Sequence, residues 1–386
     1  MKKQLLATTA AITMVGGAAS AQDWNLDWGG FMNQHVAFTS VDVGGALTPA
    51  IGVAAPDYDG IDVHSNTEII FSPSVTLDNG MTFGINVQFE GNNGFSVDES
   101  YMTISSDTMG RVEIGSENSA GYKMMVGAPG VVSMAINSPS ISSYIPFSAA
   151  GIGNSFRQGG LSTYTEVAGN NDVRRISYYT PSFNGLTVGV SYARDGVTNA
   201  GNSFAFDSKR ARLSDVFDIG VGYSQSFGSV DVDLAARWGT GSYASWVGAA
   251  PVINGPSDPE TWGIGAQFGF GAFTVGGSYA VNDNGALFGA GDQEGWDFGV
   301  TYDAAGPWAF ELSTFQGEFD NGLGVTKDEY QAYRLGASRD LGPGVDWDIY
   351  AVMVEADAGN AIGAFGPGVG TEIEGTTIGT AINLSF

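Results

Sequence analysis

The chain has 386 residues and no Cys, which excludes disulfides as a source of stability. Charged residues make up only 15% of it, against about 25% in soluble globular proteins, and 58 residues are Gly. Acids outnumber bases 41 to 15. Because nucleic acids are bound through clustered Lys and Arg, this balance excludes a nucleic-acid partner and favours cations.

Residues 1–21 have the pattern of a secretory signal peptide. Lys2 and Lys3 precede a mostly apolar run that ends near Gly17, and Ala19-Ser20-Ala21 is a small-residue cleavage pattern. The run is shorter than the roughly 18–20 apolar residues that a membrane-spanning helix needs. We therefore predict an exported protein whose mature chain, residues 22–386, forms one domain. Its net charge would be −28 in place of −26, because Lys2 and Lys3 leave with the signal.

The mature chain is a series of segments in which apolar and polar residues alternate. In MTFGINVQFE, residues 81–90, every odd position is apolar. In GTTIGTAINLSF, at the end of the chain, the residues from Ile378 to Phe386 alternate in the same way. Side chains of a strand point to opposite faces in turn, so each segment predicts a two-faced strand. The predicted strands are 24–39, 64–77, 81–90, 97–105, 110–116, 173–180, 186–194, 215–227, 230–239, 260–270, 273–281, 295–304, 308–318, 327–340, 345–357 and 376–386.

The polar faces of these strands carry acids, Gln, Arg and Gly, which cannot form the core of a soluble sandwich. Tight turns such as Asp78-Asn79-Gly80 alternate with longer connections, the longest being 117–172, the third long loop. The predicted fold is a transmembrane antiparallel β-barrel of the all-β class. In such a barrel the apolar face of each strand points outward, the polar face points inward, and short turns alternate with long loops. About sixteen strands is an even number and leaves an aqueous channel.

Four stretches make the chain resemble the Gram-negative general porins, most closely the alphaproteobacterial, Rhodobacter-like group. They are the signal with an aromatic-rich first strand, DESYMTISSDTMGRVEIGS before the long loop, RRISYYTPSFNGLTVGVSYARD after it, and the last strand ending in Phe386. The resemblance implies a homotrimer in the outer membrane of a Gram-negative bacterium, surrounded by lipid and lipopolysaccharide. It also implies that the third long loop folds into the lumen and narrows the pore. The barrel-insertion machinery would read Phe386.

The long loop departs from the family pattern. In the family, this loop usually presents acids opposite a basic cluster on the wall. Here residues 117–172 are mostly apolar and small, and their charges are few: Glu117, Lys123, Arg157, Glu166 and Asp172. A strong transverse field at the constriction is therefore not expected.

The candidate pore-lining residues are these loop charges and a few charged wall residues. Arg111 and Glu113 lie two apart and are expected on the same inner face. The other candidates are Arg174, Arg175, Arg194 and Arg237, with Arg334. Such a basic strip either orients anions in the pore, as charge rings do in channels, or pairs with wall acids to hold the loop.

No cofactor is expected, apart from loosely bound Ca²⁺ at acids of the outer loops. Carboxylate oxygens suit this ion. The alternative is a solvated loop surface. The acids in question are Asp42, Asp57, Asp59, Asp62, Asp283, Asp292 and Glu294.

The predicted function is passive diffusion of ions and small hydrophilic solutes through a water-filled barrel. Two alternatives stay open, a substrate-selective channel and a plugged or adhesive barrel. The best enzymatic rival is a lipase that uses His35 or His64 as its base. Because the chain has no G-x-S-x-G motif and no metal-spaced His pair, we do not expect an enzyme.

Overall fold

The computed structural model describes residues 23–44, 57–92, 94, 96–147, 157–196, 213–243, 246–247, 250–251, 257–285, 290–321, 327–358 and 371–386. The predicted signal peptide, residues 1–21, lies outside the described residues and stays a prediction. None of the helices in the described ranges is long and apolar enough to cross a membrane.

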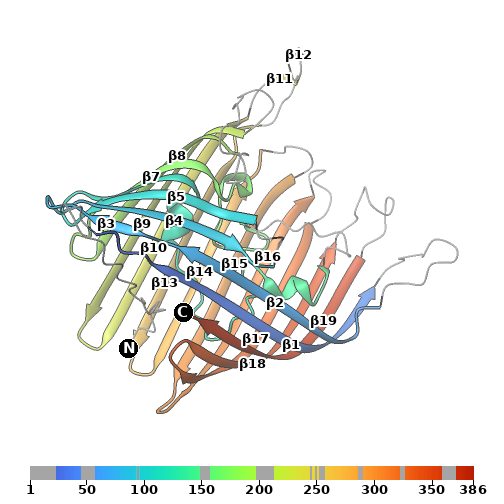
Figure 1. Cartoon of the computed structure of the whole chain (residues 1–386). Helices are drawn as coiled ribbons and strands as arrows, with labels where there is room; N and C mark the ends of the chain where they lie inside the picture. The colour runs from blue at the N-terminus through green and yellow to red at the C-terminus, as the bar shows by residue number, and fades with distance from the viewer. Residues whose placement is uncertain are drawn as a thin grey trace.

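The strands form one antiparallel sheet that closes on itself, as Figure 1 shows. Closure occurs where β1 pairs with both β2 and β19. The strands of the sheet are β1 (Trp28–Gly44), β2 (Gly60–Phe71), β3 (Ser74–Thr76), β4 (Thr82–Glu90), β5 (Ser96–Ser106), β6 (Gly110–Glu117), β7 (Val173–Tyr179), β8 (Leu186–Asp195), β9 (Leu213–Phe227), β10 (Val230–Tyr243), β13 (Glu260–Phe270), β14 (Phe273–Asp283), β15 (Ala290–Asp303), β16 (Trp308–Asn321), β17 (Lys327–Gly342), β18 (Val345–Ala358) and β19 (Thr371–Ser385).

This is a sixteen-stranded barrel, because β2 and β3 are two parts of one wall strand. Both pair with β4, and they are separated by Ser72 and Pro73. Proline has no N–H to donate to a ladder, which accounts for the break. All sixteen predicted strands are present. Several extend further than predicted at the ends with long connections, and a separate two-stranded hairpin, β11 (Trp246–Val247) and β12 (Ala250–Pro251), lies in one of these connections.

The two faces of the wall follow the predicted alternation. Large apolar side chains such as Leu312 and Leu335 are about 60% exposed, whereas their neighbours Glu311 and Arg334 are buried. Directly paired residues of adjacent strands share a face, and Leu312 pairs with Leu335. The exposed apolar face is the outer face, suited to lipid, and the other face encloses the lumen.

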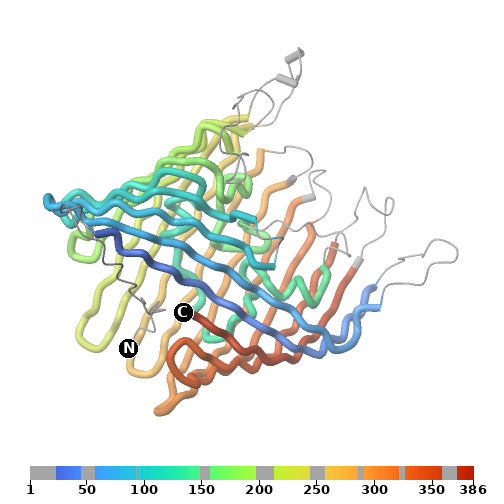
Figure 2. The backbone as a smooth tube through the Cα atoms, viewed as in Figure 1, coloured from blue at the N-terminus to red at the C-terminus, as the bar shows by residue number. Residues whose placement is uncertain are grey.

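The segment between β6 and β7 has little regular structure. It contains the short helix α1 (Ala120–Met124) and the 3₁₀ turns η1 (Ser140–Ser143) and η3 (Val167–Gly169). Ser119 caps α1 by accepting the N–H of Tyr122 at 3.2 Å. In Figure 2 the tube of this segment is seen among the strands of the barrel. We call the described residues 118–147 and 157–172 the inner segment.

The two faces can be tested with a pair of adjacent substitutions near the middle of β5. Met102 is exposed on the outer face, and Thr103 lies on the inner face opposite Gly84. We expect Met102→Arg to impair folding into vesicles far more than Thr103→Arg, because Arg on the lipid face at the midplane costs about 2–4 kcal/mol. Folded yield is measured by the shift in gel migration on heating. Equal yields for the two variants would contradict the assignment of the faces.

Candidate functional site

Carboxylates of the wall hold the backbone of the inner segment. Asp218 of β9 accepts the N–H of Gly121 at 2.8 Å, and Asp297 of β15 accepts that of Ala128 at 3.0 Å. Asp348 of β18 accepts both the N–H and the hydroxyl of Ser133, at 2.8 and 2.9 Å. A chain without a ladder has unpaired N–H groups that are costly to bury. The wall acids supply the missing acceptors.

Glu311 of β16 has the same role. It accepts the N–H groups of Val131 and Val132 and also pairs with Arg334 of β17. All four carboxylates are buried, and they share a face with the other inward residues of their strands. A single segment that contacts the non-lipid face from β9 to β18 runs along the inside of the ring.

Three of the predicted inner arginines are buried anchors of the same kind. Arg237 pairs with Asp218 and donates to the carbonyl of Thr165. Arg334 donates to the carbonyl of Met134. Buried in this way, neither guanidinium faces open water.

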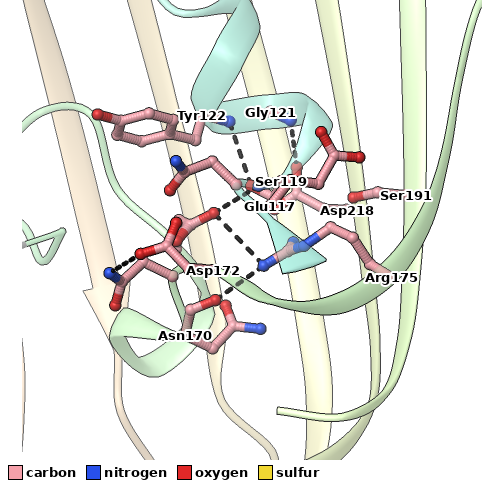
Figure 3. A network of polar contacts seen from close by, with 12 residues as sticks. Glu117, Ser119, Gly121, Tyr122, Asn170, Asp172, Arg175, Ser191 and Asp218 are labelled. Carbon is pink, nitrogen blue, oxygen red and sulfur yellow. Dashed lines mark hydrogen bonds and ion pairs between the residues drawn. The ribbon is translucent and has the colours of Figure 1, made fainter. Parts of the chain in front are cut away.

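Arg175 is the third anchor. It lies 3.6 Å from Glu166 and donates to the carbonyl of Asn170 at 2.8 Å. In Figure 3 a dashed line joins Arg175 to Asn170. Glu166 is fully buried and accepts the N–H of Ser119 at 2.6 Å. Of the two readings of the basic strip, these contacts favour the structural one for Arg175, Arg237 and Arg334.

An apolar core lies inside the barrel, which the expectation of a polar inner face did not foresee. Ile141, Ile145 and Phe147 of the inner segment pack in one cluster with small apolar residues of the wall, among them Ala332 and Val354. The remaining wall members come from β1 and from β16 to β19. The inner face of this sector is apolar because it meets the segment and not water. The same contact accounts for the apolar composition of the long loop.

The more exposed charges lie on the opposite side of the lumen. Arg111 is half exposed and pairs with buried Glu113 at 3.0 Å. Lys123 of α1 lies 2.9 Å from Glu113 and also pairs with Glu117, which is fully buried. Burial alone would lower the pKa of Lys123, but the Glu117 and Glu113 carboxylates outweigh it and hold that pKa above its ordinary value.

A cavity of about 480 Å³ adjoins this charged group. Arg111 and Lys123 line it together with hydroxyl-bearing residues, including Ser105, Tyr179 and Thr187. Cations and hydroxyls side by side can hydrate and orient a passing solute.

Arg174 and Arg194 do not lie where they were predicted. Arg174 alternates with Arg175 and shares the outer face with Ile176. Arg194 is exposed and shares the outer face with Tyr192. Both follow the apolar phase of their strands, so neither side chain lines the lumen.

Arg157 lies against α1. Its guanidinium is 3.9 Å from the centre of the Tyr122 ring, a cation–π contact. The backbone of Arg157 has φ of 66°, in the left-handed region. The positive charge of Arg157 attracts the carboxylates of Asp98, on β5, and of Asp172.

Sequence reasoning did not find every anchor. Alternation places Asp218, Asp297 and Glu311 in the polar phase of the predicted strands 215–227, 295–304 and 308–318. The sequence did not single out Asp348 or the contact between Arg157 and the Tyr122 ring. The alternation of 345–357 does place Asp348 on the inner face. Its hydrogen bonds to Ser133 join residues 215 positions apart and leave no local signal.

Three comparisons with known proteins bear on identity. The model of the Gram-negative porin family matches residues 7–359. No curated protein sequence matches the chain significantly. Among solved structures, the anion-selective porin from Comamonas acidovorans is 18% identical, with a TM-score of 0.58 over 94% of this chain and 100% of that chain.

Two further structures share the fold. OmpT of Vibrio cholerae in its trimer form is 11% identical, with a TM-score of 0.59 over 94% of this chain and 99% of that chain. A substituted porin of Rh. blastica is 18% identical, with a TM-score of 0.50 over 94% of this chain and 100% of that chain. The resemblance to porins of the Rhodobacter group is confirmed. The family model covers most of the chain and the barrel has the porin fold, so the chain belongs to the Gram-negative porin family and is a diffusion channel of the outer membrane.

Proposed function

We propose that the channel is a water-filled pore, narrowed by the inner segment, that passes ions and small hydrophilic solutes with a weak preference for cations. The observation that carries the proposal is the division of the lumen. The inner segment and an apolar core fill the sector from β16 to β1, while hydroxyls and charges line a cavity beside β5 to β8. Water in the lumen screens each charge over about 8–10 Å at physiological salt, so acids on the wall raise the cation concentration modestly.

Conductance in a planar bilayer tests this proposal. We expect ohmic single-channel steps and, under a salt gradient, a reversal potential that favours cations. This preference fades toward molar salt, where the screening length falls to about 3 Å. A substrate-selective channel would show ion current blocked by one class of solute. The apolar core inside the barrel would favour the alternative of a plugged barrel. Absence of single-channel steps would support that alternative and refute the open pore.

An enzymatic role has less support. His35 lies 3.1 Å from the Tyr350 hydroxyl, and His64 lies 3.4 Å from Asp62. In the described part of the chain, no serine hydroxyl bonds either imidazole, which a Ser-His-acid triad requires. We infer a channel that binds no cofactor for catalysis.

We propose that the channel is a homotrimer in lipid and lipopolysaccharide, inserted through recognition of Phe386. The outer face supports this, because its exposed aromatic and aliphatic side chains suit lipid or another copy of the barrel.

The trimer predicts slow gel migration before boiling and faster migration after it. The physical reason is that closed strand ladders and an apolar interface withstand detergent. Circular dichroism of the same sample should be dominated by strand. A monomer band that heating does not change would refute the trimer.

We also propose that acids on the outer face bind Ca²⁺ loosely and bridge to anionic lipid. Neighbouring strands from β19 to β15 place acids directly opposite one another in one row. The members of the row are Glu372, Asp357, Glu329, Glu318 and Glu294. Like charges in such pairs repel, and carboxylate oxygens suit Ca²⁺. Oxygens of Glu355, Glu372 and Glu374 lie within 4.8 Å of one another.

Three of the acids predicted for this role lie in the wall, on different faces. Asp42 and Glu294 lie on the outer face, where Asp42 is opposite Glu374. Asp62 lies instead on the inner face, two residues from His64, because it pairs with buried Ala37.

Calorimetric titration of the detergent-solubilised channel with Ca²⁺ tests the outer acids. We expect the triple variant Glu355→Gln, Glu372→Gln, Glu374→Gln to lose most of the heat of binding. The matched control neutralises Asp231, Asp233 and Asp303, acids near the short turns, and should retain it. An equal loss of binding heat in both variants would mean that Ca²⁺ binding depends only on the net charge of the protein and not on these three acids.

A further inference from the structure

The inward acids of the wall divide into two groups. The anchoring acids Asp218, Asp297, Glu311 and Asp348 accept hydrogen bonds from the inner segment. Three others, described next, lie on β2, β4 and β5, and none of the described residues of these three strands belongs to the apolar core. This division matters because an acid that is bound to the segment contributes little to the field in the open part of the lumen.

Glu68 and Glu90 face each other directly across β2 and β4, and Asp98 follows on β5. All three are half-buried. Within the described ranges, none of the three forms an ion pair or accepts a side-chain hydrogen bond. Directly opposed like charges are unfavourable in a sheet. These three carboxylates, the free acids, therefore lack a protein counter-charge in contact with them.

The inner segment presents bases to this part of the wall. Arg157 is stacked on the Tyr122 ring, and its charge attracts the carboxylate of Asp98. Lys123 forms ion pairs with Glu113 and Glu117.

A buried carboxylate beside the free acids points independently to a cation. Asp172 is only 4% exposed; its Oδ2 accepts from Asn171 at 2.6 Å, and its Oδ1 has no hydrogen-bond partner. Burial is the largest cause that raises the pKa of Asp172 to about 7, and the charges of Asp98, Glu166 and Glu99 add to it. A cation near Asp172 would give its Oδ1 atom a partner and would reduce the repulsion between Asp172 and the neighbouring carboxylates.

We propose that Glu68, Glu90 and Asp98 are the residues that determine cation preference, and that permeating cations follow the wall from β2 to β5, opposite Arg157. The proposal rests on the open pore proposed above. In this proposal the cation preference comes from three residues and not from all the acids of the lumen together. Small inorganic cations and organic ammonium ions are the solutes that this side of the lumen favours.

Reversal potentials under a KCl gradient at low salt test the assignment. The triple variant Glu68→Gln, Glu90→Gln, Asp98→Asn is expected to bring the ratio of cation to anion permeability close to 1. The control Asp231→Asn, Asp233→Asn, Asp303→Asn removes the same charge near the short turns and is expected to keep the original ratio. Equal shifts in both triples would overturn the assignment and leave the open pore intact. Absence of conductance in the unmodified channel would instead refute the pore itself.

A second pair of variants tests the opposing base. Arg157→Asn keeps a residue that tolerates the left-handed backbone and removes the charge beside Asp98, so cation preference should rise. Arg174→Gln removes the same charge from the outer face and should leave the ratio unchanged. The heat-shifted oligomer band shows that each variant is folded. A folded Arg157→Asn channel with an unchanged ratio would contradict the proposed path.

Discussion

The interaction on which the rest of the structure depends is the hydrogen bond from an inner-segment N–H to a wall carboxylate. A long segment without a strand or a long helix leaves its backbone donors unpaired, and it is stable inside a barrel only if the wall accepts them. Asp218, Asp297, Glu311 and Asp348 do so from four different strands. A hydrogen bond to a charged acceptor is stronger than a neutral one, about 1.5–3 kcal/mol, so several of them fix the course of the segment.

The buried arginines complete this arrangement. An isolated buried carboxylate is costly, and Arg237 beside Asp218 and Arg334 beside Glu311 supply the opposite charge. Each arginine also donates to a carbonyl of the segment, at Thr165 or Met134. In each pair the carboxylate therefore accepts from N–H groups of the inner segment, and the arginine donates to one of its carbonyl groups. Removing one partner would leave the other charge buried and would loosen the segment from both directions.

The strands were predictable because apolar and polar residues alternate along most of them. The period of two in a strand and the chemistry of turns act locally, and they located all sixteen strands. The apolar sector was not predictable in the same way. Ala332 and Val354 look like ordinary small wall residues until Ile141 and Phe147 are placed against them. Which loop meets which wall depends on closure of the whole ring.

The candidate site was predictable only as a set of inward positions. The alternation correctly placed Arg111, Arg175 and Arg237 on the inner face. Arg194 was assigned to the wrong face although it follows Leu186 and Tyr192 in the same phase. Whether an inward charge faces water or a partner is not a property of its strand. Arg237 and Arg111 have the same phase relative to the wall, yet one is buried against Asp218 and Thr165 while the other is half exposed.

The separation of anchors from free charges also reconciles a very acidic chain with the weak cation preference that we propose. A net charge of −26 suggests a strongly selective pore. Part of that charge lies on the outer face, as in the row from Glu372 to Glu294, and part of it holds the inner segment. A carboxylate that is paired with a guanidinium and bonded to backbone N–H groups presents little net field a screening length away. The field in the open sector therefore depends on the few carboxylates that have no anchoring contact, and on how close the nearest base of the inner segment lies to them.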